Sequence, residues 1–250
     1  MLERNVTVAT PDGQMPAFVT CPEARPPKAV VVMIMDGQGW REPMFDNARR
    51  LASVGYYVIM PQMFYRRIGQ GPVENVLDMD WMTTLNTDIT PAKATEDIAA
   101  CLAFAAADPA APKGGKAAVM GFCMGGRLSV SVSQGLGDRI ACAASLHPGY
   151  LATKQPNSPH LALDRISAEL YLGVAEHDPH LSPAAVARFT EALNAAGVKY
   201  SLEVLPGSGH GYSTPGNESY HKPSAERAWE RIFELFERRL DPVGGQVAAA

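Results

Sequence analysis

The stretch KAAVMGFCMGGR, residues 116–127, determines how the rest of the chain is interpreted. Its first half is a short apolar run, typical of a strand buried in a parallel sheet. Its second half has the pattern Gly-x-Cys-x-Gly around Cys123, and it predicts a tight, strained turn from strand into helix. A thiol in that turn stands at a helix N-terminus, where the helix dipole favours the thiolate. The pattern therefore predicts that Cys123 is a nucleophile, and the alternative is a tight turn around a buried, inert cysteine.

Strands and helices alternate on both sides of this turn. Predicted strands cover Asn5–Thr10, Met15–Cys21, Ala29–Met35, Tyr57–Met60, Lys116–Gly121, Ile140–Leu146, Glu169–Val174 and Tyr200–Leu205. Predicted helices cover Pro43–Val54, Ala92–Ala107, Met124–Ser133, Pro183–Ala196 and Ser224–Arg239, the last with Ser224 as its N-cap. The alternation predicts an α/β fold with a mostly parallel central sheet flanked by helices. Ligands bind such sheets at the carboxyl ends of the strands, so reactive side chains are expected directly after strands.

The length of 250 residues suits one α/β domain, which we expect over residues 1–240, with a flexible C-terminal tail at 241–250. No large insertion separates the Cys123 turn from the later strands, so no separate lid domain is expected. The irregular residues 61–90 are a long excursion over one end of the sheet, and loops of that length are usually functional or mobile.

Composition excludes several classes of partner. The net charge is -4 and no basic block occurs, which argues against nucleic acid as a partner. No apolar run approaches the roughly 18 residues of a membrane helix, and no secretory signal is visible. Four cysteines without metal-ligand spacing indicate free thiols and a cytoplasmic location.

A thiol with an ordinary pKa of about 8.5 needs a base at neutral pH. Of six histidines, His210 lies between glycines, after the last predicted strand and before the final helix. The preceding strand ends at Asp178, which would orient His210 and stabilise its imidazolium; Glu176 is the rival carboxylate. The predicted catalytic set is therefore Cys123, Asp178 and His210. His177 and His180 flank Asp178, but no second ligand group is evident, so neither a metal nor an organic cofactor is expected.

With these residues in place, the chain resembles the dienelactone hydrolase family over nearly its whole length. The resemblance is carried by GFCMGGR at 121–127, by GVAEHD ending at Asp178, by GSGHGY at 207–212 and by NARRLASVGYYVIMPQMFYR at 47–66. It implies an α/β-hydrolase fold and hydrolysis of a small ester or lactone through a cysteine nucleophile. It also implies that Asp36 stands where the family has a glutamate that helps to ionise the thiol. The backbone N–H groups of Gly37 and Met124 would form the oxyanion hole.

One departure from the family concerns substrate recognition. Members that act on dienelactones hold the substrate carboxylate with arginines. Here no arginine occurs between Arg67 and Arg127, and none directly follows His210. Arg66 and Arg67 would be substitutes from the long loop, or plain surface residues. We therefore hypothesise a related enzyme whose preferred substrate is not the dienelactone carboxylate itself.

The expected partner is a small-molecule ester or lactone, and the oligomeric state stays open. The predicted pocket residues are aromatic: Trp40, Tyr65, Trp81, Phe122 and Tyr212. Two alternatives remain. One is a broad-specificity carboxylesterase or thioesterase of the same fold, and the other is a catalytically silent module that binds or senses redox state through Cys123.

Overall fold

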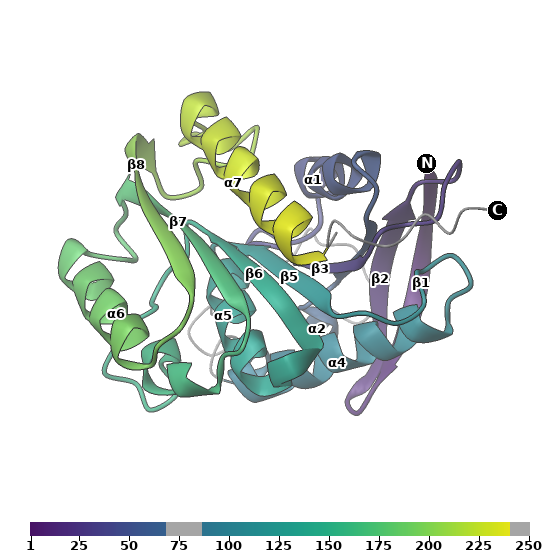
Figure 1. Ribbon diagram of the computed structural model, residues 1–250, viewed down its shortest axis with the longest axis horizontal. Coiled ribbons are helices and arrows are strands. Elements are labelled where there is room, and N and C mark those ends of the chain that lie inside the picture. Colours follow the sequence, from purple (N-terminus) through teal and green to yellow (C-terminus); the bar gives the residue numbers. More distant parts are fainter. Residues whose placement is uncertain (69–86, 241–250) are drawn as a thin grey trace, which may run out of the picture.

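The computed structural model describes residues 1–68 and 87–240 (Figure 1). Its strands are β1 (Leu2–Thr10), β2 (Gly13–Cys21), β3 (Val30–Ile34), β4 (Tyr57–Pro61), β5 (Ala117–Phe122), β6 (Ile140–Leu146), β7 (Glu169–His177) and β8 (Tyr200–Gly209). Its helices are α1 (Glu42–Ser53), α2 (Tyr65–Ile68), α4 (Pro91–Ala107), α5 (Met124–Leu136), α6 (Pro183–Ala195) and α7 (Lys222–Leu240). Short 3₁₀ turns follow α5 and β6, namely η2 (Gly137–Arg139), η3 (Pro159–Leu161) and η4 (Leu163–Arg165).

The described strands form one eight-stranded sheet in the order β1-β2-β4-β3-β5-β6-β7-β8. Only β1 and β2 run against their neighbours, and every pair from β4 through β3 to β8 is parallel. Helices α1 and α7 cover one face of the sheet, and α4, α5 and α6 cover the other (Figure 1). The predicted α/β architecture with a mostly parallel sheet is confirmed.

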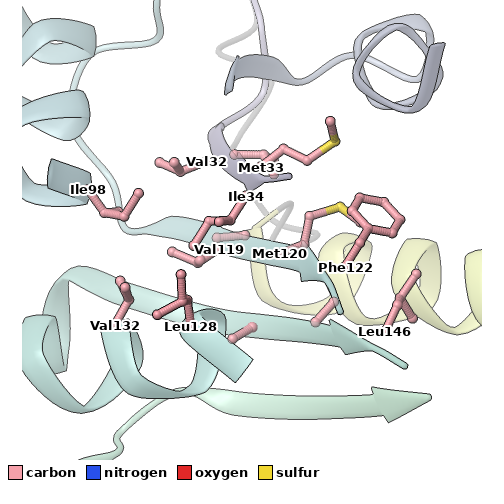
Figure 2. Close-up of a cluster of buried hydrophobic side chains, with 14 of the residues drawn as sticks. Val32, Met33, Ile34, Ile98, Val119, Met120, Phe122, Leu128, Val132 and Leu146 are labelled. Atoms are coloured by element: carbon pink, nitrogen blue, oxygen red, sulfur yellow. The ribbon is translucent and has the colours of Figure 1, made fainter. Parts of the chain in front are cut away.

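The central strands are buried because both faces of the sheet are covered. Every residue of β5 and β6 is buried, which accounts for their continuous apolar sequences. Figure 2 shows buried side chains of β3, β5 and α5, including Ile34, Val119, Phe122 and Leu128, on both faces of the sheet. This core fixes the strand ends rigidly beneath the site.

The hydrogen-bond register brings the carboxyl ends of five strands into line. Ile34 of β3 pairs with Gly121 of β5, and Phe122 at the end of β5 pairs with Leu146 at the end of β6. On the far side, His177 of β7 pairs with Gly209 of β8, after a bulge beyond Ala175. Residues that follow these strands therefore project from the same edge of the sheet.

Several element boundaries differ from the sequence prediction by a few residues, as β1, β8 and α7 illustrate. β1 begins at Leu2, because its alternately exposed residues pair with β2 over the full length of the hairpin. β8 continues to Gly209, so the loop that carries His210 is shorter than expected. α7 begins at Lys222, so Ser224 lies inside the helix, where its hydroxyl lies 2.8 Å from His221 Nδ1.

Among the described residues, no helix is both long and apolar enough to cross a membrane.

Candidate active site

Polar side chains follow five of the parallel strands directly. Asp36 comes after β3, Cys123 after β5, His147 after β6, Asp178 after β7 and His210 after β8. Because these strands are parallel and in register, the five residues gather at one edge of the sheet. Four of them were predicted as site residues from the sequence, and His147 was not.

The turn at Cys123 is strained, as the elbow pattern predicts. Cys123 has φ 52° and ψ -111°, a conformation that L-residues rarely adopt. A Cβ on Gly121 would lie 2.1 Å from the carbonyl oxygen of Gly125, and a Cβ on Gly125 would lie 2.3 Å from that of Ile34. Side chains are therefore excluded at both positions, and the elbow can pack directly against β3 and its own helix.

Cys123, His210 and Asp178 form a continuous chain of contacts. His210 Nε2 lies 2.9 Å from Cys123 Sγ, and His210 Nδ1 lies 2.8 Å from Asp178 Oδ2. The other carboxylate oxygen, Asp178 Oδ1, accepts a hydrogen bond of 2.8 Å from the amide of His180. The rival Glu176 points elsewhere and accepts a hydrogen bond from the amide of Gly207. Asp178 is thus the carboxylate that orients His210.

The surroundings of His210 favour its charged form. Burial lowers the pKa of the imidazole, but the hydrogen bonds with Asp178 and Cys123 outweigh burial and raise the pKa of His210 to about 10. A protonated imidazolium between a thiolate and a carboxylate is the arrangement in which each of the three charges has a partner. The geometry thus suits an ion pair between Cys123 and His210.

The other cysteines lie away from this site. Cys21, Cys101 and Cys142 are buried free thiols in β2, α4 and β6. Burial raises the pKa of the Cys142 thiol to about 12 and raises that of Cys101 still further. These three thiols stay protonated and shielded, and Cys123 is the only one of the four cysteines, all within the described ranges, that is not buried.

Asp36 has different partners from those that the family resemblance implies. Its two carboxylate oxygens accept hydrogen bonds of 2.6 and 2.7 Å from the Arg41 guanidinium, and one of them also accepts from the amide of Gln38. The recorded partner of Cys123 Sγ is His210, not Asp36. The Asp36–Arg41 pair instead braces the turn that carries Gly37.

A cavity of about 370 Å³ opens beside Cys123, a size suited to a small-molecule site. Gly37 and Met124, the two predicted oxyanion donors, are both in its wall. Met124 is the first residue of α5, so its N–H has no partner within the helix and is available to a ligand. The cavity thus brings the Cys123 thiol, the His210 imidazole and a helix N-terminus to one space.

The predicted aromatic residues lie outside the described wall of this cavity. Phe122 is fully buried in the core (Figure 2), and Tyr212 is buried with its hydroxyl bonded to the carbonyl of Gly173. Tyr65 donates a hydrogen bond to Asp97, and Trp40 packs against Phe45. None of these four lines the cavity: Phe122 is turned into the core by alternation along β5, and the other three are engaged in the contacts named above. Trp81, the fifth, lies outside the described residues.

Two histidines that the sequence analysis did not place in the site adjoin the imidazole of His210. The rings of His147 and His180 meet the His210 ring edge-on, with centroids at 5.3 and 4.6 Å. Burial lowers the pKa of both residues, so both are neutral beside a charged His210. The sequence offered one indication that these two histidines belong to the site, namely that they follow β6 and β7. In this fold, residues that follow the strands form the site.

The arginines weighed as carboxylate binders have protein partners. Arg66 bonds to Asp97 and to Asp12, and Arg67 bonds to Asp88. Arg66 therefore ties the segment after β4 to α4 and to the β1–β2 turn, and Arg67 ties it to the residues that precede α4. Arg127, by contrast, is in the cavity wall.

The strand order, together with a nucleophile turn after β5 and a histidine after the last strand, defines an α/β-hydrolase. Residues 15–240 match the model of the dienelactone hydrolase family, and the chain belongs to that family. The protein is thus a hydrolase of the carboxylic ester class.

Curated relatives extend over nearly the whole chain. Proteins named "Putative carboxymethylenebutenolidase" are 26% identical over 247 residues in Methylorubrum extorquens and 28% identical over 241 residues in Escherichia coli K12. The matches cover 94% and 93% of this chain and 81% and 85% of those proteins.

Solved structures share the fold. A "Putative Dienelactone Hydrolase" from Klebsiella pneumoniae superimposes with a TM-score of 0.84 at 23% identity, over 95% of this chain and 98% of that one. A dienelactone hydrolase-like promiscuous phosphotriesterase from metagenomic libraries gives a TM-score of 0.79 at 18% identity, over 95% and 98% of the two chains.

Proposed function

We propose that the protein hydrolyses a small ester or lactone through an acyl-enzyme on Cys123, with His210 as acid and base and Asp178 as its orienting carboxylate. The observation that carries this proposal is the chain of contacts from Cys123 Sγ to His210 Nε2, 2.9 Å, and from His210 Nδ1 to Asp178 Oδ2, 2.8 Å, beside the cavity. A nucleophile within reach of a base that a third group orients is the arrangement that covalent catalysis requires.

In the first half of the reaction, the Cys123 thiolate attacks the carbonyl carbon and a C–S bond forms. The carbonyl electron pair moves onto oxygen, where the N–H groups of Gly37 and Met124 stabilise it. When the intermediate collapses, the C–O bond breaks and the leaving oxygen takes the proton from His210 Nε2. The products are a thioester on Cys123 and a free alcohol, or an opened lactone that stays attached.

In the second half, water attacks the thioester carbonyl while His210 Nε2 accepts its proton. The C–S bond breaks, the carboxylic acid product leaves, and the thiolate–imidazolium pair is restored. A thiolate is a good leaving group, so an intermediate with a poor alkoxide returns to substrate instead of going forward. The enzyme should therefore prefer esters with acidic alcohols and enol lactones over alkyl esters and amides.

Asp36 acts in this scheme as a positioning residue. Its ion pair with Arg41 spans the turn Asp36–Gly39, and Gly37 in this turn is part of the cavity wall, so the pair would hold the Gly37 amide in place. A carboxylate with both oxygens engaged by a guanidinium has little capacity left to accept a proton from a thiol. In this role, Asp36 would fix the direction of the Gly37 N–H, which is the second oxyanion donor.

The proposal is tested by mass spectrometry of the protein after brief mixing with p-nitrophenyl acetate. The wild type should show an acetyl adduct on Cys123 together with a burst of nitrophenol, and Cys123→Ala should show neither. Cys101→Ala is the matched control, because it removes a buried thiol that lies far from the cavity. Turnover without an adduct on Cys123, or full activity of Cys123→Ala, would refute the scheme.

Two other functions are separated by the same assay. A broad-specificity esterase or thioesterase would hydrolyse short alkyl esters and thioesters nearly as fast as aryl esters in a leaving-group series. A silent binding or redox module would give no adduct with any ester, although the thiol of Cys123 is free.

A further inference from the structure

Backbone strain within the described ranges is concentrated around the cavity. Cys123, His147 and Tyr150 are the non-glycine residues there that have a positive φ, at 52°, 36° and 57°. A residue with a side chain enters this region only at a cost, and the surrounding structure must hold it there. Cys123 takes part in the catalytic steps, whereas the segment 147–150, His-Pro-Gly-Tyr after β6, has no part in them. The strain of this segment therefore needs its own explanation.

The first residue of the segment, His147, contacts His210 directly. It is fully buried, and its ring meets the His210 ring at 71° with the centroids 5.3 Å apart. Its backbone N–H donates a hydrogen bond of 2.8 Å to the carbonyl of Gly173 in β7, and its Nε2 lies 2.8 Å from Ser213 Oγ. Within the described ranges its Nδ1 has no hydrogen-bond partner. The contact with Ser213 thus fixes the rotation of the His147 ring.

The last residue of the segment, Tyr150, reaches His210 through His180. Its backbone N–H donates a hydrogen bond of 2.9 Å to the carbonyl of His180, and its hydroxyl lies 3.0 Å from His180 Nδ1. The His180 ring meets the His210 ring at 80° with the centroids 4.6 Å apart, and the His180 amide donates to Asp178 Oδ1. A Cβ on Gly149 would lie 3.1 Å from that of His180, so the two loops pack closely.

The mechanism requires the imidazole of His210 to keep one orientation. Its Nε2 serves the sulfur, the leaving oxygen and water in turn, while its Nδ1 stays on Asp178. A small displacement of such a group lowers a rate severely, so the residues around it must hold it. Burial lowers the pKa of His147 and of His180, so both rings are neutral and do not repel the imidazolium.

We propose that the segment 147–150 positions the His210 imidazole by two routes. Its first residue, His147, packs against the imidazole directly, and its last residue, Tyr150, acts through the ring of His180. This inference rests on the proposed function and assigns positioning residues to it. Each flanking ring is fixed by a hydroxyl bonded to one of its nitrogens, which a phenylalanine ring in the same place could not accept. Removal of either hydroxyl should slow the chemistry and leave substrate binding nearly unchanged.

The first test measures acylation in two variants, Tyr150→Phe and Ser213→Ala, each of which lacks one hydroxyl. The nitrophenol burst rate at saturating p-nitrophenyl acetate should fall about tenfold in each, while the substrate concentration for half of that rate changes less than twofold. Tyr200→Phe is the matched control, because its hydroxyl bonds to Asn194 outside the cavity and its burst should stay as in the wild type. Wild-type burst rates in both variants, or a change confined to the half-saturating concentration, would overturn the proposal.

A double variant tests the route through His180. His180→Phe keeps a flanking ring but has no nitrogen for the tyrosine hydroxyl, so its burst rate should match that of Tyr150→Phe. The variant with both substitutions should be no slower than either single one, because both remove the same contact. Additive losses would show that Tyr150 acts without His180 and would overturn this route.

The second test does not depend on hydrolysis. The proton on His210 Nδ1, in its hydrogen bond with Asp178, is followed by ¹H NMR, and its exchange rate with water reports how firmly the ring is held. Exchange should be at least fivefold faster in Tyr150→Phe and in Ser213→Ala than in the wild type and in Tyr200→Phe. Unchanged exchange in both variants would overturn the proposal. Since Tyr150 is 44% exposed, Tyr150→Phe provides this test even if Ser213→Ala does not fold.

The two tests separate this inference from the proposed function. If the wild type forms no adduct on Cys123 while proton exchange depends on the two hydroxyls, the proposed function fails and the contacts still position His210. If the adduct forms and neither the burst rate nor the exchange responds to either hydroxyl, the positioning role of the segment 147–150 alone fails.

Discussion

The His210 imidazole touches the Cys123 sulfur, with Nε2 2.9 Å from Sγ, although the two residues are 87 positions apart in the chain. The contact exists because β5 and β8 end at the same edge of the sheet and the residue after each strand projects above it. Asp178 follows β7, which lies between β5 and β8 in the sequence. Its Oδ2 contacts Nδ1, the ring nitrogen of His210 that faces away from the sulfur.

The pKa of His210 should depend on the thiol. In the wild type, hydrogen bonds with Asp178 and Cys123 raise that pKa to about 10, against the opposing effect of burial. Cys123→Ala removes one of the two groups that raise it, so the pKa of His210 in this variant should be lower than in the wild type. NMR titration of the imidazole resonances measures both values, and an unchanged pKa would mean that the thiol does not stabilise the imidazolium.

The acylation rate should fall at high pH. A histidine with a raised pKa keeps its proton through neutral pH and loses it as pH rises through about 10, which removes the proton donor for the leaving group. The pH profile of the nitrophenol burst should therefore have its alkaline limb near pH 10. In Asp178→Asn this limb should move to lower pH, and a limb that stays in place would show that it belongs to another group.

Asp178→Asn should also lower kcat by about 10²- to 10⁴-fold, because the asparagine amide no longer stabilises the imidazolium or selects its tautomer. Glu176→Gln is the matched control, since Glu176 lies two residues away and bonds to the Gly207 amide instead of to His210. Steady-state rates of p-nitrophenyl acetate hydrolysis compare the two variants. Equal losses in both would indicate that the whole β7 loop, and not Asp178, controls the rate.

Gly121→Ala should destabilise the fold severely. The added Cβ would lie 2.1 Å from a backbone oxygen of the elbow helix, and backbone cannot move aside without opening the turn. Gly114→Ala is the comparison, because its Cβ meets open space and only its φ of +77° is unfavourable, at about 1 kcal/mol. Urea unfolding of both variants measures the difference, and similar losses of stability would contradict the proposed steric requirement at Gly121.

Asp36→Asn and Arg41→Gln should impair acylation to a similar extent, and the double variant should be no worse than either single one, because both break the same brace on the Gly37 turn. Burst rates are measured in the wild type and in the three variants and are compared as a double-mutant cycle. If Asp36 instead ionised the thiol directly, Asp36→Asn would shift the pH dependence of Cys123 alkylation by iodoacetamide and Arg41→Gln would not. That outcome would replace the positioning role with direct thiol activation.

Local sequence patterns predicted most of the fold and singled out the three residues that the structure brings into contact. The apolar run before Cys123 is typical of a buried strand, and the flanking glycines permit the close backbone contacts that an elbow needs. Asp178 and His210 follow strands, and strand ends gather reactive groups in a parallel sheet. These inferences need only short-range information, which a single sequence contains.

Tertiary structure alone decided which side chains face the cavity and which are neutralised. Phe122 and Tyr212 are aromatic neighbours of reactive residues, yet alternation along the strands and packing of the loops turn both into the core. Asp36 directly precedes Gly37, the expected oxyanion donor. Its carboxylate is nevertheless paired with the Arg41 guanidinium, which lies across the turn. Arg127 directly follows the glycines of the elbow, and within residues 1–68 and 87–240 no carboxylate pairs with it. Whether a charged side chain has a partner depends on distances between residues that can be far apart in the sequence. Local sequence patterns, such as the spacing of apolar residues, contain no information about those distances.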